Sequence, residues 1–264
     1  MELTKQQVID KILSFNYVEL AEWIKNRLQG NDKYFPIYLG HEPNLSGFLI
    51  NTFRHIKDEK FRDNFLEILG DLTNQFRGLS KSQIEECKEY IVELLILCGN
   101  IRQFDNKVSL LEIAVSGKFK GIKVDEETDL HADLLTTLAS YKIVGIHKFW
   151  IDQLLDKSDR YYANPAFYAL IDNLDRLFEY IDVFIDKFKG DIELKWGIQA
   201  LINDHGKKEI VNRFKSIEPR LSFEQKQAVN HAFIEVGENP VYPIEALSEK
   251  TEKELGYKED QEAE

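Results

Sequence analysis

The sequence predicts an all-α protein built from stacked antiparallel helix hairpins. Apolar residues recur at helical spacing along nearly the whole chain, and only 6 prolines and 14 glycines interrupt its 264 residues. This low density of chain-breaking residues favours long helices over many short strands. No segment shows a convincing strand alternation, because "GIKV" at 121–124 is too short to count.

The individual helices follow from apolar spacing and from capping residues. One apolar series, Phe61 to Phe76, follows 4-3-4-4 spacing, which places its members on one helical face. Asn16 with Glu19, and Ser222 with Gln225, have the spacing of a capping box at a helix start. The same two signals predict helices near 4–14, 17–29, 45–57, 59–77, 81–98, 107–118, 127–141, 144–157, 165–189, 191–204, 207–217 and 222–236.

The arrangement of these helices follows from their short connections. Most connections have about 2–6 residues, so consecutive helices are expected to pack as antiparallel neighbours. A dozen helices are too many for a simple bundle, whereas side-by-side hairpins can each bury one face on the next. An internal sequence similarity supports this stacking, since "LLEIAVSGKFKGI" (110–122) matches "LLTTLASYKIVGI" (134–146) at 6 of 13 positions. We therefore expect one helical-repeat domain over 1–243, followed by an acidic, mobile or weakly helical tail at 244–264.

At the level of architecture, the chain resembles HEAT- or armadillo-like α-solenoids. Blocks such as "FRHIKDEKFRDNFLEILGDL" (53–72) carry the resemblance, which extends over most of residues 1–236. It implies an irregular solenoid and transfers no functional residue to this chain.

Charge sets an expectation about partners. The net charge is −12, and no stretch is strongly basic, so nucleic acid and anionic membranes are not favoured. A protein partner with a basic surface is electrostatically favoured. The polar N-terminal "MELTKQQVID" has neither the basic nor the apolar region of a secretion signal, and no apolar run is long enough for a membrane span. The expected location is the cytoplasm.

The sharpest single pattern lies in the predicted helix 165–189. Beside its apolar face runs an acidic stripe with 3-4-3-4 spacing, which is Asp172, Asp175, Glu179, Asp182 and Asp186. The stripe has three interpretations: a solvated outer face, a docking strip for a basic partner, or a cation site.

A second candidate is "KYFPIYLGHEP" (33–43), which breaks the helical pattern between Pro36 and Pro43. Its aromatic residues Tyr34, Phe35 and Tyr38 are interpreted either as a cover over the core or as a partner-binding loop.

The sequence offers no clear catalytic motif. Phosphate loops, nucleophile elbows and zinc-ligand spacings are absent, and Cys87 and Cys98 fall at apolar positions that indicate core thiols. No cofactor or metal is predicted. The remaining possibility is a helical metal-dependent phosphohydrolase, if five dispersed side chains converge in space: His131, Asp133, His147, Asp204 and His205.

The leading functional hypothesis is a non-catalytic protein-interaction module, such as an adaptor, a regulatory protein or an inhibitor of immunity type that neutralises a basic toxin. The alternatives are an enzyme on a helical scaffold and an obligate subunit of a larger complex.

Overall fold

The structure, a computed structural model, describes residues 5–30, 45–101 and 107–243. Over these ranges the protein is all-α, with 76% of residues in helices and no strand. The one β-bridge in the described ranges joins Lys123 to Asp129 within a loop. Within the same ranges, no helix is both long and apolar enough to cross a bilayer. The aromatic segment 33–43 and the acidic tail lie outside the described residues, so the predictions about them remain predictions.

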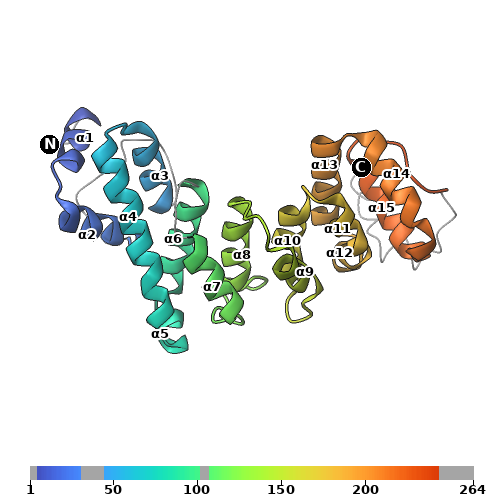
Figure 1. Ribbon diagram of the computed structural model, residues 1–264, viewed down its shortest axis with the longest axis horizontal. Coiled ribbons are helices and arrows are strands. Elements are labelled where there is room, and N and C mark those ends of the chain that lie inside the picture. Colours follow the sequence, from blue (N-terminus) through green and yellow to red (C-terminus); the bar gives the residue numbers. More distant parts are fainter. Residues whose placement is uncertain (1–4, 31–44, 102–106, 244–264) are drawn as a thin grey trace, which may run out of the picture. The chain divides into compact units, whose positions relative to one another are not determined.

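The chain divides into two compact units, Met1–Ile143 and Val144–Glu264. The expectation of a single domain over 1–243 stays a prediction. The first unit contains the helices α1 (Lys5–Leu13), α2 (Tyr17–Leu28), α3 (Leu45–His55), α4 (Glu59–Gln75), η1 (Phe76–Gly78), α5 (Lys81–Glu86), α6 (Lys88–Ile101), α7 (Lys107–Ser116) and α8 (Leu130–Ser140) (Figure 1).

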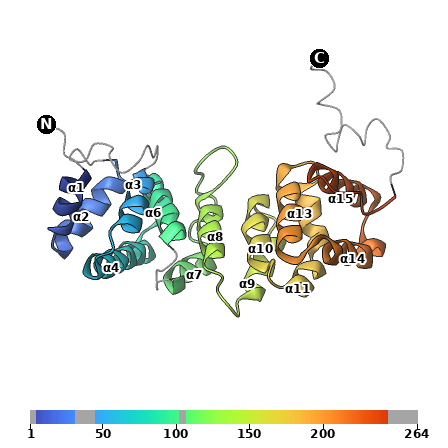
Figure 2. The same cartoon turned by 90° about the horizontal axis from the view of Figure 1, so that it is seen from above.

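Helices of the first unit pack in a staggered order. The helix α3 packs against α6, and α6 packs against α8, so helices that are not consecutive lie side by side (Figure 2). The helix α4, in turn, contacts α2, α6 and α7. Buried aromatic rings join these layers, with the Phe53 and Phe65 ring centroids 5.2 Å apart.

The internal sequence similarity between 110–122 and 134–146 corresponds to two similar helix ends. The last residues of α7 and α8 are Ser116 and Ser140. The hydroxyl of Ser116 donates to the Ile113 carbonyl, and that of Ser140 donates to the Thr137 carbonyl, each at 2.6 Å. The sequence similarity therefore marks the same local helix ending in both places.

The second unit contains the helices α9 (His147–Leu155), η2 (Arg160–Tyr162), α10 (Ala163–Leu170), α11 (Leu174–Glu179), α12 (Ile181–Phe188), α13 (Ile192–His205), α14 (Lys207–Ile217), η3 (Glu218–Arg220) and α15 (Phe223–Glu235). Its core contains two sets of contacting phenylalanine rings. Phe167 stacks on Phe184 at 4.1 Å, and Phe214 packs edge-on against Phe233 at 5.7 Å.

Two predicted helices are each broken in the structure. The segment 165–189 forms α10, α11 and α12 in place of one long helix. The cause at the first break is Asn173, whose side chain accepts a hydrogen bond from the Arg176 amide and so begins a new helix. The segment 81–98 divides at Cys87, where φ is −117° and ψ is 19°, and its second part continues past Gly99 to Ile101.

The predicted caps are confirmed where the structure describes them. Asn16 and Glu19 exchange side-chain and backbone hydrogen bonds at 2.9–3.0 Å, and Ser222 and Gln225 form the same reciprocal box. Each box satisfies amide groups that the first turn of a helix leaves without a partner.

Candidate functional site

The acidic stripe is distributed over the broken helix 165–189. Asp172 precedes α11, Asp175 and Glu179 lie in α11, and Asp182 and Asp186 lie in α12. The structure thus keeps these carboxylates in one part of the second unit, although they do not share a single helical axis.

Basic side chains lie beside Asp175, Glu179, Asp182 and Asp186. Two of them come from later in the chain: Arg213 of α14 lies 2.5 Å from Asp175, and Arg220 of η3 lies 2.7 Å from Asp182. The other two are local, from Arg176 to Glu179 at 3.1 Å and from Lys189 to Asp186 at 3.9 Å.

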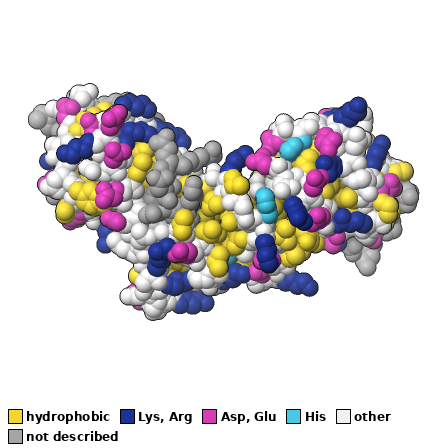
Figure 3. All heavy atoms as spheres, in the orientation of Figure 1, with side chains coloured by type: hydrophobic (Ala, Val, Ile, Leu, Met, Phe, Trp, Pro, Cys, Tyr) yellow, Lys and Arg dark blue, Asp and Glu magenta, His cyan; other side chains and the backbone are white. Residues whose placement is uncertain are grey.

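These ion pairs change the electrostatics of the stripe. The basic partners offset much of the negative charge, so the region attracts a basic partner less than its sequence indicates. On the face shown in Figure 3, acidic and basic side chains are interspersed over the helices of the second unit. The docking role of the stripe stays a prediction.

The five side chains of the metal hypothesis fall in three places. His131 and Asp133 lie in the first turn of α8, His147 begins α9, and Asp204 and His205 end α13. The Nε2 atom of His205 is 2.8 Å from the Ile171 carbonyl. Among the described residues, no group of three or more His, Cys, Asp or Glu side chains could hold a metal ion.

Asp133 has an unusual environment within the first unit. Burial, together with the negative charges of Asp125 and Asp129, raises its pKa to about 6. Its Oδ2 atom is buried and has no hydrogen-bond partner among the described residues. A buried carboxyl oxygen without a hydrogen-bond partner among the described residues is a cost to stability.

The helix α13 presents a large apolar surface to solvent. Ile192 is 50% exposed and Trp196, one turn later, is 51% exposed. Residues four apart lie on the same face of a helix, so these two side chains form one patch. We call Ile192 and Trp196 the α13 face.

The opposite side of α13 is held close to the core. At Gly197, an added Cβ atom would lie 3.1 Å from the Phe184 ring and 3.2 Å from the Phe167 ring. The absence of a side chain lets α13 approach these rings closely. Trp196, the preceding residue, therefore lies on a helix that packs closely on the core.

A small cavity of about 240 Å³ adjoins the α13 face. Ile192 and Leu194 line one side, and Ala228 and Ala232 of α15 line the other. His231 lies at the same cavity, 3.5 Å from Glu235. Small side chains on α15 leave the space open beside the exposed isoleucine.

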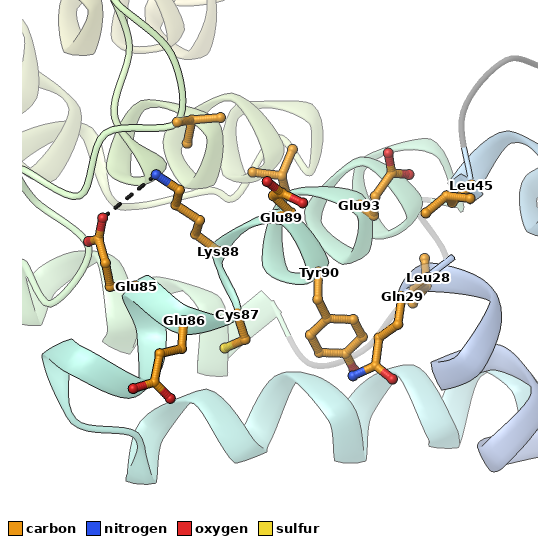
Figure 4. Close-up of a pocket in the computed structure, with 12 residues that line it drawn as sticks. Leu28, Gln29, Leu45, Glu85, Glu86, Cys87, Lys88, Glu89, Tyr90 and Glu93 are labelled. Carbon is orange, nitrogen blue, oxygen red and sulfur yellow. Dashed lines mark ion pairs between the residues drawn. The ribbon is translucent and has the colours of Figure 1, made fainter. Parts of the chain in front are cut away.

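A larger groove lies in the first unit, where α5 meets α6. Its volume is about 630 Å³, and it is lined by the end of α2, the start of α3, the α5–α6 junction and the loop after α7 (Figure 4). The break at Cys87 shapes the groove, because it turns the end of α5 away from the axis of α6. We call this cavity the junction groove.

Four glutamates line the junction groove: Glu85, Glu86, Glu89 and Glu93. Lys88 is the one basic side chain among the lining residues; it lies 3.6 Å from Glu85 and donates to the Lys123 carbonyl at 2.7 Å. The lining thus carries four negative charges against one positive charge.

The four carboxylates differ in their contacts. Glu93 accepts a hydrogen bond from the Ser46 amide at 2.8 Å, which ties α6 to the start of α3. Figure 4 shows Glu89 and Glu93 projecting from the same side of α6, with Leu45 beside Glu93. Neither Glu86 nor Glu89 has an ion-pair partner within the described ranges.

The rest of the junction groove is mostly apolar. Leu28, Leu45, Val92 and Val124 contribute hydrocarbon surface, and the Tyr90 ring packs edge-on against Phe76 at 6.3 Å. Cys87 is half-buried in the groove, and its thiol donates to the Gln83 carbonyl at 3.0 Å. Burial raises the pKa of this thiol, so it is a poor nucleophile. Cys98, by contrast, is the core thiol that the sequence predicts.

Sequence reasoning missed both surfaces. The junction groove combines residues from segments near 28, 45, 85–93 and 124, and no local pattern connects them. The glutamates at 85, 86, 89 and 93 can be read from the sequence, but the continuous helix predicted over 81–98 has no groove at its middle. The comparison of this chain with protein-family models, curated proteins and solved structures found no match.

Proposed function

We propose that this protein is a non-catalytic protein-interaction module that binds another protein through the α13 face. The observation that carries the proposal is the half-exposed pair Ile192 and Trp196 on a helix that packs closely on the core. Tryptophan contributes strongly to protein–protein binding, because it buries a large rigid surface at low entropic cost. The adjoining 240 Å³ cavity, which Asp191, His231 and Glu235 also line, offers room for one side chain of the partner.

A stacked-hairpin architecture of HEAT or armadillo type suits this function. The packing of α3 on α6 and of α6 on α8 supports such stacking in the first unit. Extended helical stacks expose much surface for their size, and proteins of this kind commonly bind other proteins. The net charge of −12 favours a partner with a basic surface.

Affinity capture from the native host tests the proposal. The full chain serves as bait, as wild type and as Ile192→Ala with Trp196→Ala. The control bait carries Val115→Ala with Val144→Ala, which removes exposed apolar groups outside the α13 face. We expect at least one protein that both the wild type and the control retain, and that the α13-face variant loses about tenfold or more.

Captured proteins that are equally abundant on all three baits would argue against the α13 face. The obligate-subunit hypothesis predicts the same exposed patch, and light scattering separates the two: a monodisperse monomer favours the free module. Metal analysis addresses the phosphohydrolase alternative, since stoichiometric bound zinc, manganese or iron would support it.

A further inference from the structure

We propose that the junction groove binds a lysine- or arginine-bearing segment of a partner protein. This inference rests on the proposed function, since it specifies the chemistry of a segment that an interaction module would bind. It concerns a different unit of the chain from the α13 face and can be tested separately.

Charge complementarity is the first argument. The groove lining carries a net charge of −3, and its one cation, Lys88, is already engaged by Glu85 and by the Lys123 carbonyl. The two glutamates without an ion-pair partner among the described residues, Glu86 and Glu89, can accept hydrogen bonds from an incoming ammonium or guanidinium group. Both side chains are exposed, so the charge-assisted hydrogen bonds that they form should weaken as salt screens them.

The apolar lining is the second argument. Lysine and arginine side chains combine a hydrocarbon stem with a charged end, and the stem packs on apolar surface while the end reaches polar groups. The junction groove supplies both surfaces: Leu45 lies beside Glu93 in Figure 4, and Val92 also lines the groove. A simple metal ion would use only the carboxylates, and these do not form a metal-ligating group within the described ranges.

The volume is the third argument. About 630 Å³ falls in the range of sites that bury several side chains of a ligand. A chain segment that places two or three residues in the groove therefore fits better than a single ion.

The experiment uses a defined probe, an acetylated and amidated ten-residue peptide of alternating lysine and alanine. Its control has glutamine in place of lysine. Binding to the full-length protein is measured by fluorescence anisotropy at 20 mM and at 300 mM NaCl. We expect the lysine peptide to bind at low salt and to weaken strongly at high salt, and the glutamine peptide not to bind.

Two variants locate the binding. Glu86→Gln with Glu89→Gln removes two groove charges, and Asp63→Asn with Glu67→Gln removes two exposed charges from α4 outside the groove. Both variants have the same net charge and should keep the wild-type thermal midpoint. We expect the groove variant to lose about tenfold in affinity and the control to lose less than about twofold.

The rate of thiol labelling at Cys87 measures peptide binding independently. Cys98 is fully buried, so a thiol reagent should label only Cys87 in the native protein. The bound lysine peptide should slow that labelling several-fold, whereas MgCl₂ at equal ionic strength should not.

Three results would overturn the inference: no binding of the lysine peptide at 20 mM NaCl, equal weakening by both charge variants, or protection of Cys87 by MgCl₂ equal to that by the peptide. The second result would indicate diffuse attraction to the net charge. None of them bears on the capture experiment at the α13 face, so the failure of one proposal is distinguishable from that of the other.

Discussion

At the scale of single residues, the buried carboxyl of Asp133 has the clearest measurable consequence. A free aspartate has a pKa of about 3.9, and the environment of Asp133 raises this to about 6. Between these pH values the folded protein holds more protons than the unfolded chain. The contribution of Asp133 to stability therefore falls as the pH rises through this window.

Asp133→Asn removes this titration. We expect the variant to equal the wild type in free energy of unfolding near pH 4 and to exceed it at pH 7 by about 1 kcal/mol, a value reduced because the side chain is partly exposed. Urea unfolding at both pH values measures the difference. Asp63→Asn, at an exposed position, should change stability by less than about 0.5 kcal/mol at either pH. A variant that is less stable than the wild type at pH 7 would contradict the raised pKa of Asp133.

At the scale of helices, local signals were readable from the sequence and distant contacts were not. The Asn16 and Ser222 boxes involve residues three apart, so their spacing alone predicts them. The break at Asn173 was missed because the apolar rhythm continues across it, since each short helix buries its own apolar side. Arg213 and Asp175 are 38 residues apart, and only the fold brings them together.

The contact between α10, α12 and α13 gives a test at this scale. Gly197→Ala would place a methyl group 3.1–3.2 Å from two fully buried rings that are themselves stacked at 4.1 Å. The rings have little room to shift, so the steric cost should exceed the gain in helix propensity. We expect a net loss of about 1 kcal/mol in the free energy of unfolding.

Gly99→Ala in α6 is the matched control. The nearest atoms to an added Cβ there are 3.8 Å away, an ordinary contact distance. Replacing glycine by alanine inside a helix should then stabilise the protein by up to about 1 kcal/mol. Equal effects of the two substitutions in thermal or urea unfolding would show that the close approach at Gly197 does not contribute to the free energy of unfolding.

At the scale of the whole molecule, the division into two units bears on how the chain folds. The aromatic core of the second unit, from Phe167 to Phe233, is assembled entirely from residues of that unit. The sequence predicted the all-α class from its helical spacing, but nothing local in the sequence marks a division near residue 143.

A fragment of residues 144–264 should therefore fold by itself. We expect a helical circular dichroism spectrum and a cooperative thermal transition, because the buried apolar groups that drive folding are present in the fragment. The full chain, melted under the same conditions, provides the comparison. A fragment that lacks a cooperative transition would instead favour the single domain that the sequence predicted.

The distribution of tryptophan gives the molecule a built-in optical reporter. Two of its three indole rings, Trp23 and Trp150, are 6% and 2% exposed, whereas Trp196 is 51% exposed. A water-soluble quencher such as acrylamide should therefore reach the emission of Trp196 first. Any protein that covers the α13 face should shield this emission and shift it to shorter wavelength, so binding there can be followed with no dye attached.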